Sequence, residues 1–533
     1  MDVDFLSGPP ALLHNVFADH AASDPTRIWC NFQGSDYTYA EIDVRANRFA
    51  HALRGEFGIK KSDVVAVYMA NSVEYFVSML AIYRLGAVYL PCSTLFSQDE
   101  LSYQFSHAEV RAVICDQVNL DLAILSLPSN AYPCPVILCG EQTRAGVFSL
   151  DELIDSGSEL MPSQAESVNA DDLAMLIYTS GTTDRPKGVM LSQGNLTVAG
   201  QVWAKHLRWR EDDRYLHFFP LYHANGGIAG VAPAILAGAT LAMVPKFSAS
   251  TFSQMLVENR ATIASVNSTH VKMILQCPEA EFDRAHNARR MMFGMTLEES
   301  HWRTFEERFD TRLVGGYGLT ESIGSKILAD PTGPRAVGAA GRVTRGYTLR
   351  LVDDDGNAVG TNEPGEALLH AHQRHGLALG YFKDPVKTSE TFGEWLHTGD
   401  ILRVDEDGFV WFVSRKKDMI KRSGFNVAGA EVERAIRTVP GVLDVVVVGT
   451  PDAIREEAIV AFVVSEVLGA VHEDDVFDQC SKLLADYKRP QFVVFMESLP
   501  LNFVGKVERK ILRELALEYR IDSTEWAPVE RRG

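Results

Sequence analysis

The chain has 533 residues, of which 46% are hydrophobic and 23% charged, and its formal net charge is −19. This length predicts two or more domains, and the composition is that of a globular protein rather than a disordered one. The negative charge argues against general binding to nucleic acid or to an anionic membrane surface, so a phosphate-bearing ligand needs a local basic or amide-rich site.

Seven cysteines are scattered along the chain without a CxxC pair, and their total is odd. This pattern is typical of small buried side chains in a reducing compartment, and we therefore expect a cytoplasmic protein. The opening residues, MDVDFLSGPP, are acidic and lack the apolar segment of a signal peptide.

Strand and helix patterns alternate up to about residue 330. A helix predicted over residues 39–53 places Ile42, Ala46, Phe49 and Leu53 on one face. Continuous apolar runs predict the strands, among them DVVAVYM, AVYLP, RAVICD, LAMLIYT, RYLHFFP, TLAMVP, TIASVN and RLVGGYG. Apolar strands separated by helices predict parallel sheets covered on both faces, whose ligands bind at the carboxyl ends of the strands.

The stretch from Ala224 to Pro245 carries no charge and is long enough to suggest a membrane span. Its Gly-Gly start, Pro233 and Gly238 interrupt it. We therefore predict a short buried helix and a strand here, and no membrane span. Later, residues 336–413 show short strands with hairpin turns, typical of a small β-barrel or β-layer, and residues 418–533 look like a compact α+β domain.

Residues 178–188, YTSGTTDRPKG, lie at the end of the strand predicted for LAMLIY. They do not form a GxxxxGK[ST] loop, because Lys187 lies between Pro186 and Gly188. Their hydroxyl, glycine and lysine groups nevertheless suit a polyphosphate. The groups belong to Thr179, Ser180, Gly181, Thr182, Thr183 and Lys187. An ordinary turn is the alternative interpretation, because Gly, Ser, Thr and Pro are common turn formers.

Two carboxylates lie in comparable places. In GGYGLTES, Thr320 and Glu321 follow a buried strand, where the carboxylate would hold Mg²⁺ against phosphate oxygens. In WLHTGD, Asp400 is expected on a turn, where it would accept two hydrogen bonds from ribose hydroxyls. The alternatives are a helix N-terminal acid for Glu321 and a plain turn residue for Asp400.

Two basic stretches complete the set of motifs. SRKKDMIKRSGFNV carries five cations around one glycine turn, and LPLNFVGKVERK carries Lys506 after Gly505. The five cations are Arg415, Lys416, Lys417, Lys421 and Arg422. A solvated linker is the alternative for the first stretch, and a surface lysine is the alternative for Lys506.

The five motifs occur together and in one order. On these residues the chain resembles the adenylate-forming superfamily of acyl-CoA synthetases, luciferases and nonribosomal adenylation domains, and the resemblance covers essentially the whole chain. It implies an α/β fold with a large N-terminal adenylation domain, residues 1–414, of two doubly wound sheets plus a small β-barrel. A hinge at 415–417 and a small mobile α+β lid domain, 418–533, would follow.

The implied activity is that of an ATP-dependent acyl-CoA ligase. A carboxylic acid and ATP would give an acyl-adenylate and pyrophosphate, and CoA would then take the acyl group and release AMP. The implied cofactor is Mg²⁺, with ATP and CoA as co-substrates. Two alternatives stay open at this point: loading of a carrier protein's phosphopantetheine arm, and a non-catalytic protein that binds a nucleotide or acyl-adenylate. We expect a monomer or homodimer.

The resemblance assigns the nucleotide contacts residue by residue. Residues 179–183 and Lys187 would hold the β- and γ-phosphates, and Glu321, next to Thr320, would bind Mg²⁺. Gly316, Tyr317 and Gly318 would form the wall against adenine, and Asp400 and Arg415 would hold the ribose. Lys506 would bridge the carboxylate, the ribose and the α-phosphate, where two anions meet and a cation must offset their repulsion.

The same cation would obstruct the thiol in the second reaction, which gives the small domain a reason to swing about Lys417. Gly424 and Phe425 would then line the pantetheine tunnel. The expected catalytic residues are therefore Lys506, Glu321, His223, Lys417 and Thr179.

The acid pocket is expected around FFPLYHANGG, where His223 would border the carboxylate site and gate it against the thiol. Amino-acid-activating relatives usually carry an Asp in this segment, and none is present here. This favours an acid without an α-amino group, and glycines beside the pocket suggest a roomy site. By the same resemblance the lining would include Phe218, Gly227, Asn267, Ser268, Thr269, Gly294, Met295 and Gly315.

The chain departs from the family pattern in two places. FGMTLEES stands where many relatives have Gly-Ala-Pro before the adenine wall, so the resemblance assigns no definite contacts to Met295 and Thr296. Asp184 stands where a small neutral residue is common and would disfavour a triphosphate unless it points to solvent or pairs with Arg185. Together with PLNFVGK, these features bring the chain nearest to the carnitine and crotonobetaine CoA ligase-like branch.

Overall fold

The computed structural model describes residues 10–128, 134–141, 144–160, 167–179, 185–294, 297, 299–422, 425–452, 455–467, 469–501 and 507–518. The chain divides into two compact units. The first unit contains the residues up to Arg350, residues 368–398 and residues 408–410, and the second contains residues 351–367, 399–407 and 411–533. The predicted domain limit at 414 and the hinge at 415–417 stay predictions.

A nine-stranded sheet in the first unit carries the later alternating strands, as predicted. Its order is β16-β15-β14-β13-β12-β10-β11-β1-β2, and β10 to β14 run parallel. The strands are β1 (Ile28–Phe32), β2 (Ser35–Thr38), β10 (Arg214–His217), β11 (Thr240–Met243), β12 (Ile263–Val266), β13 (Arg290–Gly294), β14 (Arg312–Leu319), β15 (Gly324–Leu328) and β16 (Arg342–Val343). Strand β15 turns back antiparallel to β14 and thereby closes a hairpin.

An eight-stranded sheet carries the earlier strands in the order β19-β9-β8-β4-β3-β5-β6-β7. The strands are β3 (Val64–Tyr68), β4 (Val88–Pro91), β5 (Ala112–Asp116), β6 (Val136–Cys139), β7 (Val147–Ser149), β8 (Leu173–Thr179), β9 (Lys187–Ser192) and β19 (Gly380–Tyr381). Its central strands are parallel and buried on both faces, whereas β8, β9 and β19 pair antiparallel at one end.

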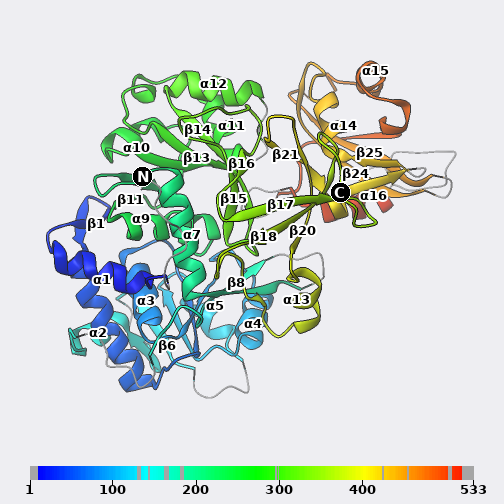
Figure 1. Ribbon diagram of the computed structural model, residues 1–533. Coiled ribbons are helices and arrows are strands. Elements are labelled where there is room, and N and C mark those ends of the chain that lie inside the picture. Colours follow the sequence, from blue (N-terminus) through cyan, green and yellow to red (C-terminus); the bar gives the residue numbers. More distant parts are fainter. Residues whose placement is uncertain are drawn as a thin grey trace. The chain divides into compact units, whose positions relative to one another are not determined.

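Helices cover both sheets, and α2 and α3 pack against each other (Figure 1). The predicted face of α2 is confirmed, because Ile42, Ala46, Phe49 and Leu53 are all fully buried. A capping box at Thr38 begins α2, and Gly58 with a φ of 66° ends it. The helices of the first unit are α1 (Leu13–Ser23), α2 (Tyr39–Phe57), α3 (Val73–Arg84), α4 (Gln98–His107), α5 (Leu120–Leu125), α6 (Leu150–Ser156), α7 (Gln193–His206), α8 (Ala224–Gly227), α9 (Val231–Ala237), α10 (Phe252–Glu258), α11 (Ser268–Gln276), α12 (Glu299–Phe309) and α13 (Pro385–Thr391).

The uncharged stretch 224–245 folds into two short helices, α8 and α9, where one was predicted, and into the predicted buried strand β11. Within the described residues, no helix is long and apolar enough to cross a membrane. All seven cysteines are free, and four of them are buried.

The predicted β-layer supplies strands to more than one sheet. Strands β17 (Tyr347–Val352), β18 (Gly365–Ala371), β20 (Leu396–Val404) and β21 (Val410–Arg415) form a four-stranded sheet in that order. Strands β16 and β19, from the same stretch of sequence, instead extend the two large sheets. The stretch therefore connects the sheets as well as forming a layer of its own.

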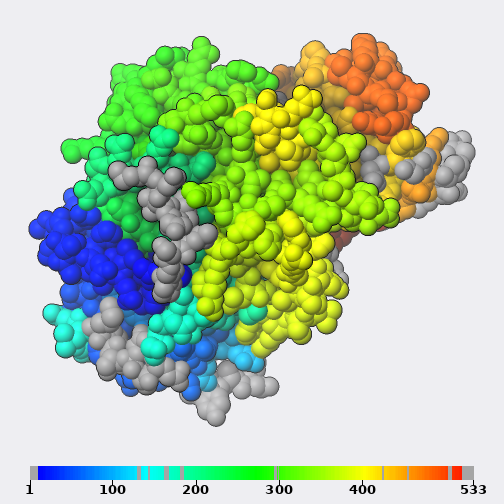
Figure 2. All heavy atoms as spheres, in the orientation of Figure 1, coloured from blue at the N-terminus to red at the C-terminus, as the bar shows by residue number. Residues whose placement is uncertain are grey.

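The C-terminal region is α+β, as predicted. Its sheet has the order β23-β22-β25-β24, with β26 paired to β25, and apolar clusters lie on its two sides. The elements are β22 (Met419–Arg422), β23 (Phe425–Ala428), α14 (Gly429–Ile436), β24 (Val442–Asp452), β25 (Glu456–Ser465), α15 (Glu473–Leu483), β26 (Phe492–Met496) and α16 (Arg509–Glu518). Helix α15 buries only Val476 and Cys480, and its surface is orange in Figure 2.

Candidate functional site

The predicted phosphate loop joins two antiparallel strands of the first unit. Thr179 ends β8 and pairs with Lys187, which begins β9, and Tyr178 pairs with Gly188. The intervening Ser180, Gly181, Thr182, Thr183 and Asp184 lie outside the described residues. The structure thus brings together the two ends of the loop, one with a hydroxyl and one with an ammonium group.

Glu321 lies on the turn between β14 and β15, and the element after it is a strand rather than the helix of the alternative interpretation. Ser322 Oγ accepts a hydrogen bond from Leu319 N at 3.0 Å and donates to Gly324 O at 2.9 Å. Ile323 has a φ of 52°, in the left-handed region that is unfavourable for a β-branched side chain. The turn that carries the glutamate is therefore tightly specified.

Lys326, on β15, braces this turn from inside. Its side chain is 1% exposed, its Nζ donates to Ile323 O at 3.2 Å, and it lies 5.3 Å from the centre of the Tyr347 ring. Burial lowers the pKa of Lys326 to about 7. The sequence analysis missed this lysine, because a single Lys inside a strand pattern usually faces solvent.

Tyr381 links the glutamate to the phosphate-loop lysine. Its hydroxyl donates to Glu321 Oε1 at 2.9 Å, and Lys187 Nζ lies 5.4 Å from the centre of its ring. Burial, followed by the charge of Glu321, raises the pKa of Tyr381. Tyr381 was not predicted either, although the nearby GYFKDP stretch ends in a helix-initiating Asp-Pro pair that marks an ordered turn.

The expected adenine wall lies on β14, where Gly316 pairs with Gly294 of β13. A Cβ atom on Gly318 would lie 2.2 Å from Gly324 O, so glycine is required for the hairpin to close. Gly315 precedes them on the same strand, Tyr317 is buried, and Thr320 begins the turn. Met295 and Thr296 lie outside the described residues.

The residues expected at the acid pocket have clear local roles. His223 caps α8, its Nδ1 accepting from Asn225 N at 3.2 Å, and burial lowers its pKa, which favours a neutral imidazole at pH 7. Asn267 caps α11 by accepting from His270 N at 2.8 Å, and Ser268 and Thr269 follow in its first turn. These caps fix where both side chains lie, whatever they bind.

The two glycines of this segment do not indicate a roomy pocket. A Cβ atom on Gly226 would lie 2.2 Å from Pro220 O, and one on Gly227 would lie 2.7 Å from Leu221 O. Both positions therefore need glycine so that α8 can pack against the preceding backbone.

An aromatic cluster that the sequence analysis did not anticipate lies behind this segment. Phe218 stacks on Phe219, with 5.1 Å between ring centres, and His270 lies 5.2 Å from Phe218 and 4.2 Å from Phe247. Burial lowers the pKa of His270 to about 4. Phe218 belongs to the apolar core of this cluster, which is uncharged at neutral pH.

In the second unit, Asp400 and Arg415 come together as predicted. Arg415 Nε lies 3.2 Å from Asp400 Oδ1, and Asp400 is 4% exposed. Asp400 belongs to strand β20 rather than to a turn, and the turn-like residue is Gly399, with a φ of 66°. A buried carboxylate beside a guanidinium can accept hydrogen bonds from vicinal hydroxyls.

Both neighbours of the predicted hinge residue Lys417 are held by ion pairs. Lys416 Nζ donates to Glu366 Oε2 at 2.7 Å, and this hydrogen bond raises the pKa of Lys416. Asp418 accepts from Arg513 of α16 at 2.5 Å, whereas Lys417 itself is exposed. The basic stretch is therefore more than a solvated linker.

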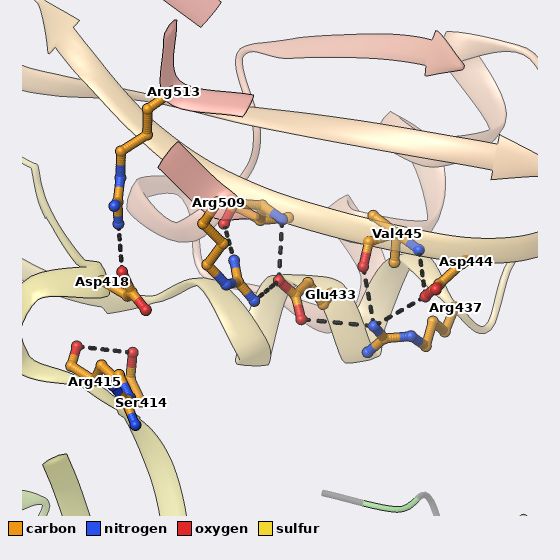
Figure 3. A network of polar contacts seen from close by, with 10 residues as sticks. Ser414, Arg415, Asp418, Glu433, Arg437, Asp444, Val445, Arg509 and Arg513 are labelled. Carbon is orange, nitrogen blue, oxygen red and sulfur yellow. Dashed lines mark hydrogen bonds and ion pairs between the residues drawn. The ribbon is translucent and has the colours of Figure 1, made fainter. Parts of the chain in front are cut away.

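Gly424 and Lys506 lie outside the described residues. Their described neighbours are well fixed: Phe425 is 52% exposed and stacks on Tyr487 at 4.4 Å, and Arg509 begins α16. Arg509 donates to Glu433 at 2.6 Å and to Val447 O at 2.7 Å, and Glu433 also lies 3.6 Å from Arg437. Figure 3 shows Glu433 between Arg509 and Arg437.

The stretch HAHQRH has a density of histidines that is typical of a metal site, but the structure gives each histidine a different partner. His370 contacts Glu394 O, His372 contacts Thr348 Oγ1, and His375 contacts Ser192 Oγ. Across the described ranges, no group of three or more His, Cys, Asp or Glu side chains could hold a metal ion.

Sequence comparison finds matches to known proteins over most of the chain. Residues 17–382 match the AMP-binding enzyme family, and residues 431–506 match the AMP-binding enzyme C-terminal domain. A crotonobetaine/carnitine–CoA ligase of Salmonella agona is 32% identical over 482 residues, which cover 90% of this chain and 93% of that ligase.

Solved structures of CoA ligases are similar to this chain over nearly its full length. The anthranilate CoA ligase AuaEII, in complex with anthranoyl-AMP, has a TM-score of 0.86 at 26% identity and covers 96% of this chain and 98% of its own. ATP-bound MatB from Rhodopseudomonas palustris has a TM-score of 0.84 at 30% identity, and the match covers 94% of this chain and 98% of MatB.

Proposed function

The chain belongs to the family of AMP-binding enzymes and is an AMP-forming acid–CoA ligase, and from this premise we propose how its residues carry out the two reactions. The acid first attacks the α-phosphorus of ATP, giving an acyl-adenylate and releasing pyrophosphate. The CoA thiol then attacks the acyl carbonyl and releases AMP. The observation that carries the residue assignment is that Tyr381 contacts both Glu321 and Lys187.

The phosphates of ATP bind between Lys187 and Glu321. The loop 179–183 supplies hydroxyl and amide donors, and Lys187 supplies a positive charge. Glu321 suits Mg²⁺, because this ion usually takes one or two protein carboxylates and completes its shell with phosphate oxygens and water. When bound, the ion offsets the negative charge of the phosphate oxygens.

The ribose hydroxyls bind Asp400, whose orientation is set by Arg415 at 3.2 Å. Lys506 reaches the junction of the carboxylate and the α-phosphate and offsets the charge that builds there. Arg509, three positions later, supports this assignment, because its bonds to Glu433 and Val447 O fix the start of α16.

For the second reaction, the C-terminal residues turn about Lys417 so that Lys506 leaves the junction and Gly424 and Phe425 approach the thiol's path. The contacts around Lys417 support a hinge at this position. Lys416 is held by Glu366 and Asp418 by Arg513, so the exposed Lys417 lies between two neighbours that are anchored to different segments of the chain.

The acid is one without an α-ammonium group. Residues 217–227 contain no Asp or Glu, and the aromatic cluster behind them is uncharged at neutral pH. His223, with its pKa lowered by burial, borders the carboxylate as a neutral donor. We expect a cytoplasmic enzyme that acts as a monomer or homodimer, with free CoA rather than a carrier protein as acceptor.

A panel of acids tests this proposal. It contains aliphatic, aromatic and betaine-type acids together with α-amino acids, and AMP formation is measured with CoA, with a carrier protein and without acceptor. We expect turnover with a non-amino acid and CoA. Discharge by the carrier protein alone would favour the carrier-loading alternative, and ATP binding without any turnover would favour the non-catalytic one.

A further inference from the structure

Residues 375–382 form a segment of the first unit that joins the two halves of the proposed phosphate site. Ala378 N donates to Glu321 O at 3.0 Å, at the turn that carries the glutamate. Leu379 N donates to Met190 O at 2.9 Å, and Phe382 N donates to Gly188 O at 2.8 Å, both on the strand that Lys187 begins. One short segment therefore fixes the distance between the glutamate turn and the lysine strand.

The segment is itself anchored at both ends. Asn195, which also caps α7, donates from Nδ2 to His375 O at 2.7 Å and to Leu377 O at 2.8 Å. At the other end, Tyr381 N donates to Thr388 Oγ1 at 2.9 Å, and Tyr381 pairs with Val189 across β19 and β9. The backbone that carries Tyr381 is therefore fixed by hydrogen bonds to α7, to β9 and to Thr388.

The side chain of Tyr381 connects the two charged groups. It is 8% exposed, and its protonated hydroxyl donates to one carboxylate oxygen of Glu321 at 2.9 Å, which leaves Oε2 as the oxygen not engaged by the tyrosine. Its ring faces Lys187 Nζ at 5.4 Å, within the range at which a cation is attracted to an aromatic face.

We propose that Tyr381 is a positioning residue for adenylate formation, whose hydroxyl orients Glu321 toward the metal–triphosphate complex and whose ring holds Lys187 beside it. The inference rests on the proposed function of Glu321 and Lys187. Tyr381 does not touch the reacting atoms, and it acts by limiting the orientations of the two groups that hold the phosphates.

Two substitutions in the full-length protein separate the hydroxyl from the ring. Tyr381→Phe removes the hydrogen bond to Glu321 and keeps the ring, so affinity for ATP should fall about tenfold with Mg²⁺ and stay unchanged in EDTA. Tyr381→Leu also removes the ring, so affinity for ATP should fall in EDTA as well. Both affinities are measured by calorimetry, which needs no acid substrate.

Tyr39→Phe is the matched control. It removes another buried hydroxyl of the same unit, one that lies at the start of α2 and donates to Ala239 O at 2.9 Å. We expect this variant to bind Mg²⁺–ATP with wild-type affinity. The two tyrosines thus separate loss of a buried hydrogen bond from loss of orientation at Glu321.

A second readout uses the two half-reactions. With an acid that the wild-type protein activates, Tyr381→Phe should need about tenfold more Mg²⁺ for half-maximal pyrophosphate release. It should convert supplied acyl-adenylate and CoA to thioester at the wild-type rate. Unchanged Mg²⁺ dependence, or equal loss in both half-reactions, would overturn the inference. If the wild type activates no acid, the proposed function fails, and the calorimetric result still decides whether Tyr381 orients the metal–nucleotide site.

Discussion

The two units hold their functional residues by different kinds of contact. In the first, Lys187 and Glu321 belong to elements joined by backbone hydrogen bonds from residues 378–382, and the glutamate turn is braced by buried Lys326. In the second, Arg415, Lys416, Asp418 and Arg509 are each held by an oppositely charged side chain. Backbone pairing gives a phosphate site of fixed geometry, whereas the functional residues of the second unit depend on charged side chains that a single substitution can remove.

The largest expected effect comes from breaking the ion pairs of Glu433, which is 5% exposed. Glu433→Ala leaves Arg509 and Arg437 without this carboxylate and Val447 N without its side-chain acceptor, so it should destabilise the second unit by about 3 to 5 kcal/mol. Hydrogen exchange should show faster opening of β24 and β25, with β8 and β9 unchanged. The exposed Glu466→Ala is the control, and equal losses from both variants would contradict the account.

Lys506→Ala tests whether adenylate formation depends on a lysine of the second unit. Loss of one positioned charge should slow adenylate formation about 100- to 1000-fold, which corresponds to roughly 2.7 to 4 kcal/mol. Thiolysis of supplied acyl-adenylate should be little affected. Lys482→Ala, an exposed lysine on α15, should behave as wild type in both assays. Adenylate formation by Lys506→Ala at the wild-type rate would remove this role.

Lys326→Met tests the buried brace of the first unit. The pKa of Lys326 is about 7 in the folded chain against an ordinary value of 10.5, so between these pH values the unfolded chain binds more protons and wild-type stability rises with pH. Removing the amine should stabilise the chain by on the order of 2 to 3 kcal/mol near pH 7.

The stability gain of Lys326→Met should shrink as the pH rises toward 10. Urea unfolding at several pH values measures it, with exposed Lys246→Met as the control. A gain that does not change with pH would show that folding leaves the pKa of Lys326 at its ordinary value.

The smallest expected effect is that of Glu366→Gln, which weakens the pair with half-exposed Lys416. The loss in stability should be under about 1 kcal/mol and should disappear in high salt, because a partly exposed ion pair is screened. Urea unfolding at low and high ionic strength measures this. A loss in stability as large as that of Glu433→Ala, or one insensitive to salt, would contradict the distinction between a partly exposed ion pair and one with a buried carboxylate.

Local patterns in the sequence predicted much of the fold. The apolar period of α2, the breakers within 224–245 and the continuous apolar strands are local signals, and each predicted the observed element. The motif order predicted the family. Asp400 lies beside Arg415, and Thr179 pairs with Lys187, while the ligands assigned to these residues stay predictions.

Contacts between distant segments could not be predicted in this way. Tyr381 lies on a two-residue strand whose partner is Val189, and no local pattern reveals that pairing. Burial of Lys326 depends on Tyr347, from another strand. The glycines at 226 and 227 suggested room but are required by the nearby carbonyls of Pro220 and Leu221, because only the folded backbone shows what a Cβ atom would meet.

The central claim, that a carboxylate of the substrate attacks the α-phosphorus of ATP, is tested most directly by an isotope. An acid labelled with ¹⁸O in its carboxylate is converted by the full-length protein with ATP and CoA, and the mass of the AMP is measured. Attack at the α-phosphorus predicts AMP carrying one labelled oxygen, because thiolysis leaves the bridging oxygen on phosphorus. Unlabelled AMP formed along with the thioester would contradict the account.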